Sequence, residues 1–259
     1  MKLKNYILTV TLCVAGVLNS WSQNIVQQAD SAYNETAYSQ ALQLYETTLD
    51  SIGASSDLYY NIGNTHYRLG DLGRAVLWYE RALQLDPTNK DARANLEFVN
   101  TRITDKPVDN RSIVTRVYDK IANSQSADTW SWITFTFFVI TVIAVIGYIV
   151  TNTVVVRKAF FFGGGSVLIL TFLSLIITFT AAKRSSSHDN AIIISPAAQL
   201  STAPREATDA STQAFLLHEG TKVSIVDSVK PSEVGQPGWY EVKIGNARAW
   251  INGKDLERI

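Results

Sequence analysis

Residues 56–89 read SDLYYNIGNTHYRLGDLGRAVLWYERALQLDPTN, and this stretch decides the fold of the amino-terminal region. Apolar residues recur at helical spacing on both sides of Gly70. Glycine at this point is typical of a turn. Ala75 and Ala82 are small where two helices would cross, and Pro87 cannot continue the second helix. The stretch therefore predicts a helix, a turn and a second helix that packs on the first.

The 34-residue length and the small-residue spacing resemble the tetratricopeptide repeat. Ile62 and Gly63 fall where the first helix approaches its partner closely. Tyr59 replaces the usual tryptophan and His66 the usual tyrosine, and both residues suit packing positions. The resemblance implies an all-α solenoid that carries no chemistry of its own and presents a groove to another protein.

One repeat cannot bury its own apolar faces, so neighbours are expected on both sides. Before it, Ala41 and Tyr45 occupy the same small and aromatic positions, while Thr36 stands where glycine would make the turn. After it, residues 91–97 begin another first helix. We expect two and a half repeats, or about five helices, over residues 25–104.

The binding surface is predicted on the first helix of the central repeat. Asp57, Tyr60, Asn64, Tyr67 and Arg68 recur at spacings of three and four, which places them on one side of that helix. Polar and aromatic side chains suit the backbone and side chains of a peptide. The alternative is an ordinary solvated helix face. Replacing Asn64 and Arg68 together with alanine is expected to weaken partner capture and to leave folding nearly intact, because substitutions of exposed residues usually cost under about 0.5 kcal/mol.

Two uncharged segments, residues 130–150 and 159–182, are long enough to cross a bilayer of about 30 Å. The summed free energy of membrane insertion for the first segment is about −4 to −7 kcal/mol. A buried helical hairpin of a soluble domain is the alternative. Residues 163–165 are glycines, but no strand precedes them and no lysine follows, so a phosphate loop is excluded. They predict close helix packing, or a kink.

The amino terminus resembles a secretory signal: Lys2 and Lys4 precede an apolar run, and the small residues Ser20 and Ser22 follow it. Cleavage after Ser22 is expected, with a retained anchor as the alternative. Either outcome exports the next domain, so both soluble domains would be periplasmic and the protein a multi-pass protein of the bacterial inner membrane. Cys13 falls within the apolar run, so the mature chain would hold no disulfide.

Between the repeats and the first span, Ile113, Val117 and Ile121 recur at helical spacing. An amphipathic helix on the membrane surface and a plain linker helix both fit this pattern.

Beyond the second span, short β-rich runs separated by turns predict a small all-β barrel. Residues 239–244 and 249–251, joined through Gly245 and Asn246, form a predicted hairpin. The runs LHEGTKVSI, GWYEVKI and AWINGKDLERI resemble the bacterial SH3-like domain. The aromatic cluster that grips polyproline is not evident, so a proline-rich ligand is unsupported. The broader family permits contact with peptidoglycan. The candidate strands are residues 191–194, 215–217, 223–226, 239–244 and 249–251.

Nothing in the sequence favours catalysis, a metal or a cofactor. His66, His188 and His218 are dispersed, without a metal-ligand motif. The chain has 46% hydrophobic residues and no net charge, and acidic residues outnumber basic ones between Gln23 and Asp128. That balance argues against nucleic-acid binding.

The order of these parts resembles BatE, the tetratricopeptide member of the Bacteroides aerotolerance group. The resemblance implies a membrane-anchored interaction scaffold in an envelope complex associated with stress tolerance. Its partners would be membrane proteins with von Willebrand A domains and a MoxR-type ATPase system. The alternative is a cell-wall-binding module whose repeats recruit an enzyme or sensor.

The expected organisation is therefore multidomain. Its parts are a signal peptide (1–22), tetratricopeptide repeats (23–106), a juxtamembrane linker or amphipathic helix (107–129), a transmembrane helix (130–150), a cytoplasmic loop (151–158), a second transmembrane helix (159–182), a linker (183–189) and an SH3-like domain (190–259).

Overall fold

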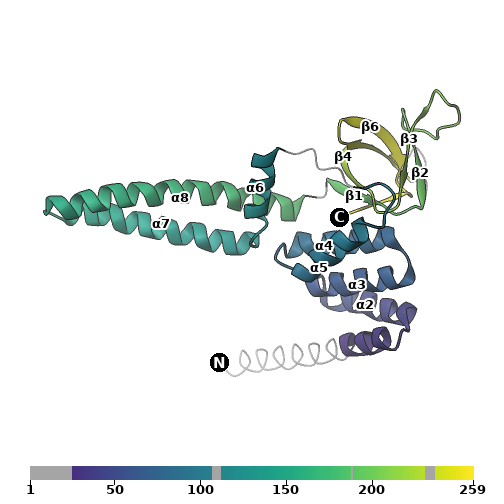
Figure 1. Cartoon of the computed structure of the whole chain (residues 1–259), viewed down its shortest axis with the longest axis horizontal. Coiled ribbons are helices and arrows are strands. Elements are labelled where there is room, and N and C mark those ends of the chain that lie inside the picture. Colours follow the sequence, from purple (N-terminus) through teal and green to yellow (C-terminus); the bar gives the residue numbers. More distant parts are fainter. Residues whose placement is uncertain (1–24, 107–111, 188, 231–236) are drawn as a thin grey trace, which may run out of the picture. The chain divides into compact units, whose positions relative to one another are not determined.

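The computed structural model of the chain describes residues 25–106, 112–187, 189–230 and 237–259. It divides into two compact units (Figure 1). The first unit holds the described parts of Met1–Leu83, Asn89–Val108 and Asp189–Ile259, and the second those of Gln84–Thr88 and Asp109–His188. The predicted signal peptide, residues 1–22, and His188 lie outside the described residues.

Helices fill the amino-terminal part of the first unit, as the repeat pattern predicted. Ser55 and Asn89 start two of them, because each side chain accepts a hydrogen bond from a backbone N–H of the first turn. A helical segment over residues 25–34 precedes the four labelled helices. These are α2 (Tyr38–Ile52), α3 (Ser56–Leu69), α4 (Leu72–Leu85) and α5 (Lys90–Asn100).

Both predicted turns contain a residue with positive φ. Gly70 ends α3 with a φ of 84°, a left-handed conformation that glycine adopts without strain. Thr36, at the corresponding position one repeat earlier, has a φ of 63°. A β-branched residue adopts this conformation at a cost of about 1–3 kcal/mol, so the degenerate repeat keeps its turn despite losing its glycine.

Asp71 begins α4 as a capping residue. Its carboxylate accepts hydrogen bonds from the backbone N–H of Arg74 at 3.0 Å and from the Arg74 guanidinium at 2.8 Å. Burial opposes ionisation of Asp71, but hydrogen bonds from His66 and Arg74 outweigh it and hold its pKa well below the ordinary value. His66 is itself buried, as a packing residue would be.

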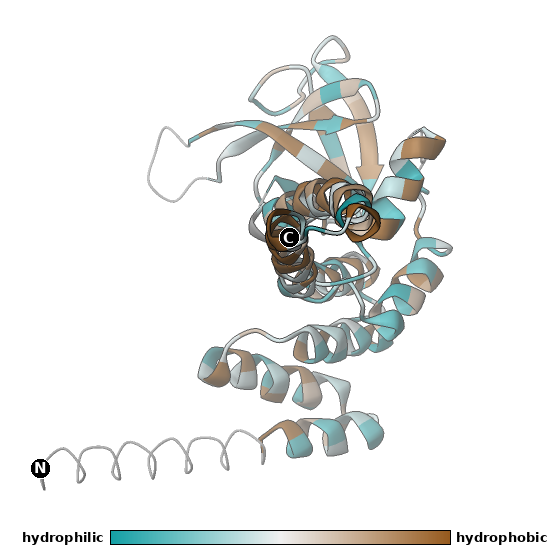
Figure 2. Cartoon of the chain, turned by 90° about the vertical axis from the view of Figure 1, so that its left-hand side faces the viewer, coloured by the Kyte–Doolittle hydropathy of each residue, from teal (hydrophilic) through white to brown (hydrophobic). Residues whose placement is uncertain are grey.

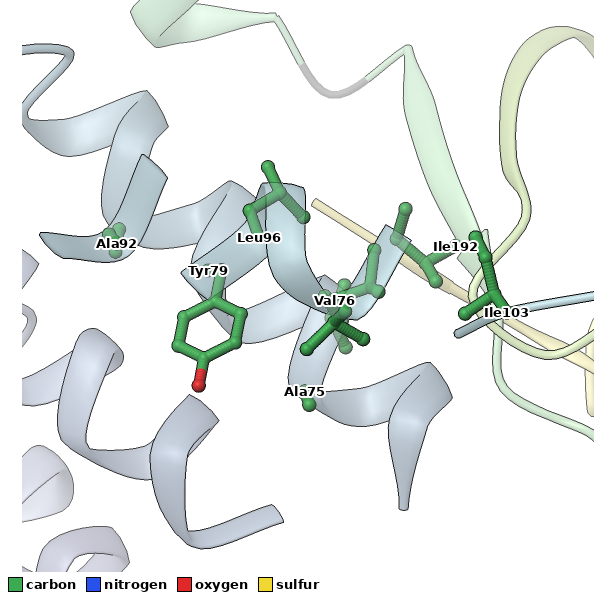
Figure 3. Packing of buried hydrophobic residues seen from close by; sticks show 10 residues of the cluster. Ala75, Val76, Tyr79, Ala92, Leu96, Ile103 and Ile192 are labelled. Atoms are coloured by element: carbon green, nitrogen blue, oxygen red, sulfur yellow. The ribbon is translucent and has the colours of Figure 1, made fainter. Parts of the chain in front are cut away.

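The small residues of the central repeat lie where α3 and α4 meet. A Cβ added at Gly63 would stand 2.8 Å from the Tyr79 ring, which is closer than real contacts allow. Ala75 and Ala82 are completely buried. Figure 3 shows Ala75, Val76 and Tyr79 within the cluster that fills this core.

Enlarging Ala75 should therefore destabilise the repeats. We expect Ala75→Leu to lower the free energy of unfolding by about 1–3 kcal/mol, because the added carbons have no space in a fully buried contact. This loss is measured by urea unfolding, in which the unfolded fraction is monitored by proteolytic cleavage within residues 25–106. An unchanged midpoint would contradict the repeat packing described above.

The carboxy-terminal part of the first unit is an antiparallel sheet of seven strands in the order β3-β2-β6-β5-β4-β1-β7. The sheet is not closed into a barrel, so the prediction of a small all-β barrel is wrong in this respect. The pattern also missed β2, whose sequence AAQLS has no β-branched or aromatic residue, and β7, which has three residues. The strands are β1 (Asn190–Ile193), β2 (Ala197–Ser201), β3 (Gln213–His218), β4 (Lys222–Val229), β5 (Trp239–Ile244), β6 (Ala247–Asn252) and β7 (Leu256–Arg258).

The predicted hairpin is confirmed by the pairing of β5 with β6, in which Ile244 lies opposite Ala247. Gly245 makes the turn with a φ of 56°. As the alternation predicted, Tyr240, Val242 and Ile244 share a face and pack into the core of the sheet.

Strand β1 joins the helices and the sheet of the first unit, because its residues pack into the hydrophobic core of each. Ile192 of β1 belongs to the helical cluster (Figure 3), whereas its neighbour Ile193 belongs to the sheet core. Asp105, which follows α5, accepts hydrogen bonds from the His218 backbone N–H at 2.6 Å and the Thr221 hydroxyl at 3.0 Å. Burial raises the pKa of Asp105, but these bonds outweigh it and lower the pKa below its ordinary value.

The second unit contains a short helix, α6 (Ile113–Ala122), and a hairpin of two long apolar helices, α7 (Ala127–Val150) and α8 (Val154–Ser186). Both long helices could cross a membrane by length and composition. Because α8 begins at Val154, the predicted loop 151–158 is shorter than expected, and Arg157 lies within the helix. Figure 2 shows apolar residues along both helices.

Small and hydroxyl-bearing residues line the contact between α7 and α8. A Cβ on Gly164 would meet the Ala144 Cβ at 2.9 Å, which supports the predicted packing role at this glycine, whereas a Cβ on Gly163 or Gly165 would meet nothing within 4 Å. The hydroxyls of Thr134 and Thr178 lie 2.9 Å apart and hydrogen-bond across the hairpin.

Candidate protein-binding groove

A hollow of about 240 Å³ opens on the helical part of the first unit. Four of its residues lie on one side of α3 at the predicted spacings. The others come from the segment before α2, from α4 and from α5. The lining residues are Tyr33, Tyr60, Asn64, Tyr67, Arg68, Tyr79, Asn95, Phe98 and Val99.

The floor of the hollow is a hydrogen-bonded network centred on Asn64. The Asn64 amide oxygen accepts hydrogen bonds from the Tyr79 hydroxyl at 2.7 Å and from the Asn95 amide at 2.8 Å. Burial raises the pKa of Tyr79, so its hydroxyl keeps its proton and remains a donor. These bonds tie α3 to α4 and α5.

The role of Asn64 therefore differs from the sequence interpretation. The prediction of an exposed residue whose loss leaves folding nearly intact is wrong for Asn64, because the side chain is half-buried and bridges three helices. Removing it would leave the Tyr79 hydroxyl without its acceptor, which costs about 1–3 kcal/mol. Asn64 is thus unsuitable for testing the binding surface alone.

Two arginines flank the aromatic part of the hollow. Arg68 is exposed, and its Nε donates to the Tyr33 hydroxyl at 3.4 Å. Arg102 is also exposed; its guanidinium lies 4.4 Å from the Phe98 ring centroid and donates to the Tyr67 hydroxyl. None of the described residues that line the hollow is acidic. Its rim is consequently cationic and its walls are aromatic.

Of the predicted residues, Tyr60, Asn64, Tyr67 and Arg68 are brought together and Asp57 is not. Asp57 is exposed in the first turn of α3, where its charge complements the helix dipole.

Two of the lining residues that the single-helix pattern missed, Tyr33 and Phe98, could have been found from the repeat period. A shift of 34 positions relates Tyr67 to Tyr33, and likewise relates Asn64 to Phe98 and Arg68 to Arg102. The groove is built from equivalent positions of successive repeats.

Residues suited to a metal do not gather elsewhere. Across residues 25–106, 112–187, 189–230 and 237–259, no three His, Cys, Asp or Glu side chains form a group that could hold an ion. His66 Nδ1 lies 3.5 Å from Asp71, and His218 Nδ1 lies 3.2 Å from Asp105. Each of these histidines pairs with one carboxylate inside the first unit.

The fold and the groove together define a helical-repeat protein with an appended antiparallel sheet. Comparison with known families agrees, because residues 56–89 match the tetratricopeptide repeat. Over 82 residues the chain is 33% identical to the protein CTR9 homolog of Arabidopsis thaliana, a match that covers 31% of this chain and 8% of that protein. The chain thus spans a small part of the length of this relative. Tetratricopeptide repeats point to protein partners.

Proposed function

We propose that this protein is a membrane-anchored interaction scaffold of the bacterial envelope, without catalytic activity of its own, that holds a partner through its repeat groove. The observation that carries the proposal is the hollow beside α3, with aromatic walls and a rim of Arg68 and Arg102. Such a surface favours an extended segment in which a carboxylate stands near an apolar or aromatic side chain.

Membrane anchoring is supported by the two apolar helices of the second unit. Large apolar side chains on both helices are exposed, including Phe138 at 55% and Phe172 at 61%. A soluble protein rarely exposes a continuous apolar surface of this kind. As a hairpin, the two helices would return the chain to the side from which it entered. The predicted secretory signal would place both soluble domains in the periplasm.

The order of repeats, two spans and a carboxy-terminal β domain supports a BatE-type role in an aerotolerance complex. Membrane proteins with von Willebrand A domains and a MoxR-type ATPase system are the partners that this resemblance implies. The sheet is proposed as an SH3-like domain. In the alternative function this domain contacts peptidoglycan, and the repeats recruit an enzyme or sensor.

Site-specific crosslinking tests the groove directly. Phe98 lines the hollow and is 47% exposed, so a photoreactive benzoylphenylalanine at this position would face a bound partner. The full chain is irradiated in native membranes, and crosslinked proteins are identified by mass spectrometry. The same group at exposed Lys90, outside the hollow, is the control. Equal capture from both positions would contradict the proposal.

Topology gives a separate prediction. Protease added to sealed spheroplasts should digest both the helical repeats and the sheet domain, because both are proposed to be periplasmic. Immunoblotting with antibodies to each domain follows the digestion, and a cytoplasmic protein serves as the control for sealing. Survival of either domain until lysis would show that the proposed orientation is wrong.

A further inference from the structure

Helix α6 exposes an apolar face that the described residues of the second unit leave uncovered. The relative exposure of its large apolar side chains is 71% for Ile113, 79% for Val114, 53% for Val117 and 46% for Ile121. At 100° per residue these four side chains fall within one stripe of the helix. Ser112 fixes the start of α6 by accepting a hydrogen bond from the Thr115 backbone N–H. The stripe therefore belongs to a well-defined helix.

The side of α6 next to the apolar stripe is hydrogen-bonded to the hairpin of α7 and α8. The hydroxyls of Tyr118 and Thr180 hydrogen-bond at 2.7 Å, which ties α6 to α8. The Trp130 indole N–H donates to the Ala122 carbonyl at 3.3 Å, which ties the end of α6 to α7. Figure 1 shows α6 lying across the hairpin, at the end opposite the connection between α7 and α8. Its direction is thus set by the hairpin.

The attachment point lies close to the end of the apolar run of α8. Thr180 precedes Lys183, the first charged residue after that run, by about 4.5 Å along the helix. Phe179, next to the attachment point, is 73% exposed. The apolar surface of the hairpin therefore continues to the level at which α6 crosses it.

Charge is arranged beside the apolar stripe of α6. Arg116 and Lys120, both exposed, border the stripe on the side away from Tyr118 and Ala122. Asp119 lies on the opposite side of the helix from the stripe. Seen from the connecting end of the hairpin in Figure 2, apolar residues of α6 are visible beside the hairpin. Apolar stripe, basic border and hairpin contact thus occupy three sides of one helix.

We propose that α6 binds the phospholipid surface, with its apolar stripe in the acyl-chain boundary and with Arg116 and Lys120 among anionic headgroups. The inference rests on the proposed membrane insertion of α7 and α8. Lipid is the occupant because the stripe lies next to the side of α6 that contacts the hairpin, whose exposed apolar side chains would face lipid, and because its basic border complements anionic headgroups. The helix would fix the rotation and depth of the hairpin at this end.

Fluorescence quenching in vesicles tests the depth of α6. The sequence has one cysteine, Cys13, so Cys13→Ser provides a background for single labelling sites in the full chain. An environment-sensitive NBD dye is attached at Val114→Cys on the stripe, or at Thr115→Cys, an exposed position outside the stripe. Ile143→Cys, in the middle of α7, reports whether the hairpin is inserted. Vesicles of phosphatidylcholine and phosphatidylglycerol contain nitroxide lipids with shallow or deep spin labels.

The expected result is shallow quenching at Val114→Cys that exceeds the quenching at Thr115→Cys by on the order of twofold, with deep quenching at Ile143→Cys. Deep quenching at Ile143→Cys without a difference between the two α6 sites would overturn the inference and leave membrane anchoring intact. Dye at Val114→Cys that is shielded from water but not quenched would mean that protein covers the stripe, which also overturns it. No quenching at Ile143→Cys would overturn both proposals.

Discussion

Replacing Tyr79 with alanine should unfold the helical repeats under conditions in which the native protein is stable. The side chain is 1% exposed, its ring fills the space left by Gly63, and its hydroxyl donates to Asn64. Truncation of a buried aromatic residue costs about 3–5 kcal/mol, a large part of the stability of a small domain. The loss in free energy of unfolding is measured by urea unfolding of the full chain in detergent, in which the unfolded fraction is monitored by proteolytic cleavage within residues 25–106.

Tyr79→Phe is the matched control, because it keeps the ring and removes the hydroxyl. Asn64 retains its bond from Asn95, so this change should cost only about 1 kcal/mol. If the alanine and phenylalanine variants were equally stable, the ring would not be the packing element between α3 and α4.

Replacing Arg68 and Arg102 together with alanine should reduce partner capture from the groove by about tenfold or more. Each substitution removes a charge-assisted hydrogen bond from a guanidinium to a bound carboxylate, and the loss of such a bond weakens binding by about 1.5–3 kcal/mol. Both residues are exposed and their bonds are to tyrosine hydroxyls, so the fold should be little affected. Crosslinking yield from position 98 in native membranes measures the effect.

Lys90→Ala with Lys106→Ala controls for the change in net charge, since both lysines belong to the same unit, are exposed and lie outside the hollow. This pair should keep the crosslinking yield of the native chain. A yield that falls equally in both double variants would indicate long-range attraction and not a groove contact. An unchanged yield in the arginine variant would assign the partner to another surface.

The helical region could be predicted because local signals agree with tertiary packing. Gly70 closes a turn, Gly63 admits the Tyr79 ring, and Ala75 is small where it is buried. The groove was predicted only in part, since reading one helix at a time finds Tyr67 and Arg68 but not side chains from adjacent repeats. The burial of Asn64 depends on its partner Asn95, and no local pattern reveals that pairing.

The sheet was harder to predict, because its edges depend on pairing and not on composition. The β5–β6 hairpin follows from alternation around Gly245. In contrast, β7 is formed by three residues whose partner is β1, more than sixty positions earlier in the chain. Whether a sheet closes depends on such distant pairings, and the resemblance to SH3-like domains stays a prediction.

The double role of β1 has a consequence for the integrity of the solenoid. A stack of repeats needs a terminal cap, because its last helix otherwise leaves an apolar side open to water. Among the described residues of the first unit, α5 is not followed by a second helix of its own repeat, and Ile192 joins Ala92, Leu96 and Ile103 in the last cluster of the stack. The β domain thus serves as the cap of the solenoid. Separating the repeats from this domain would uncover their final apolar layer, so the two behave as one folding unit despite the two spans between them in the sequence.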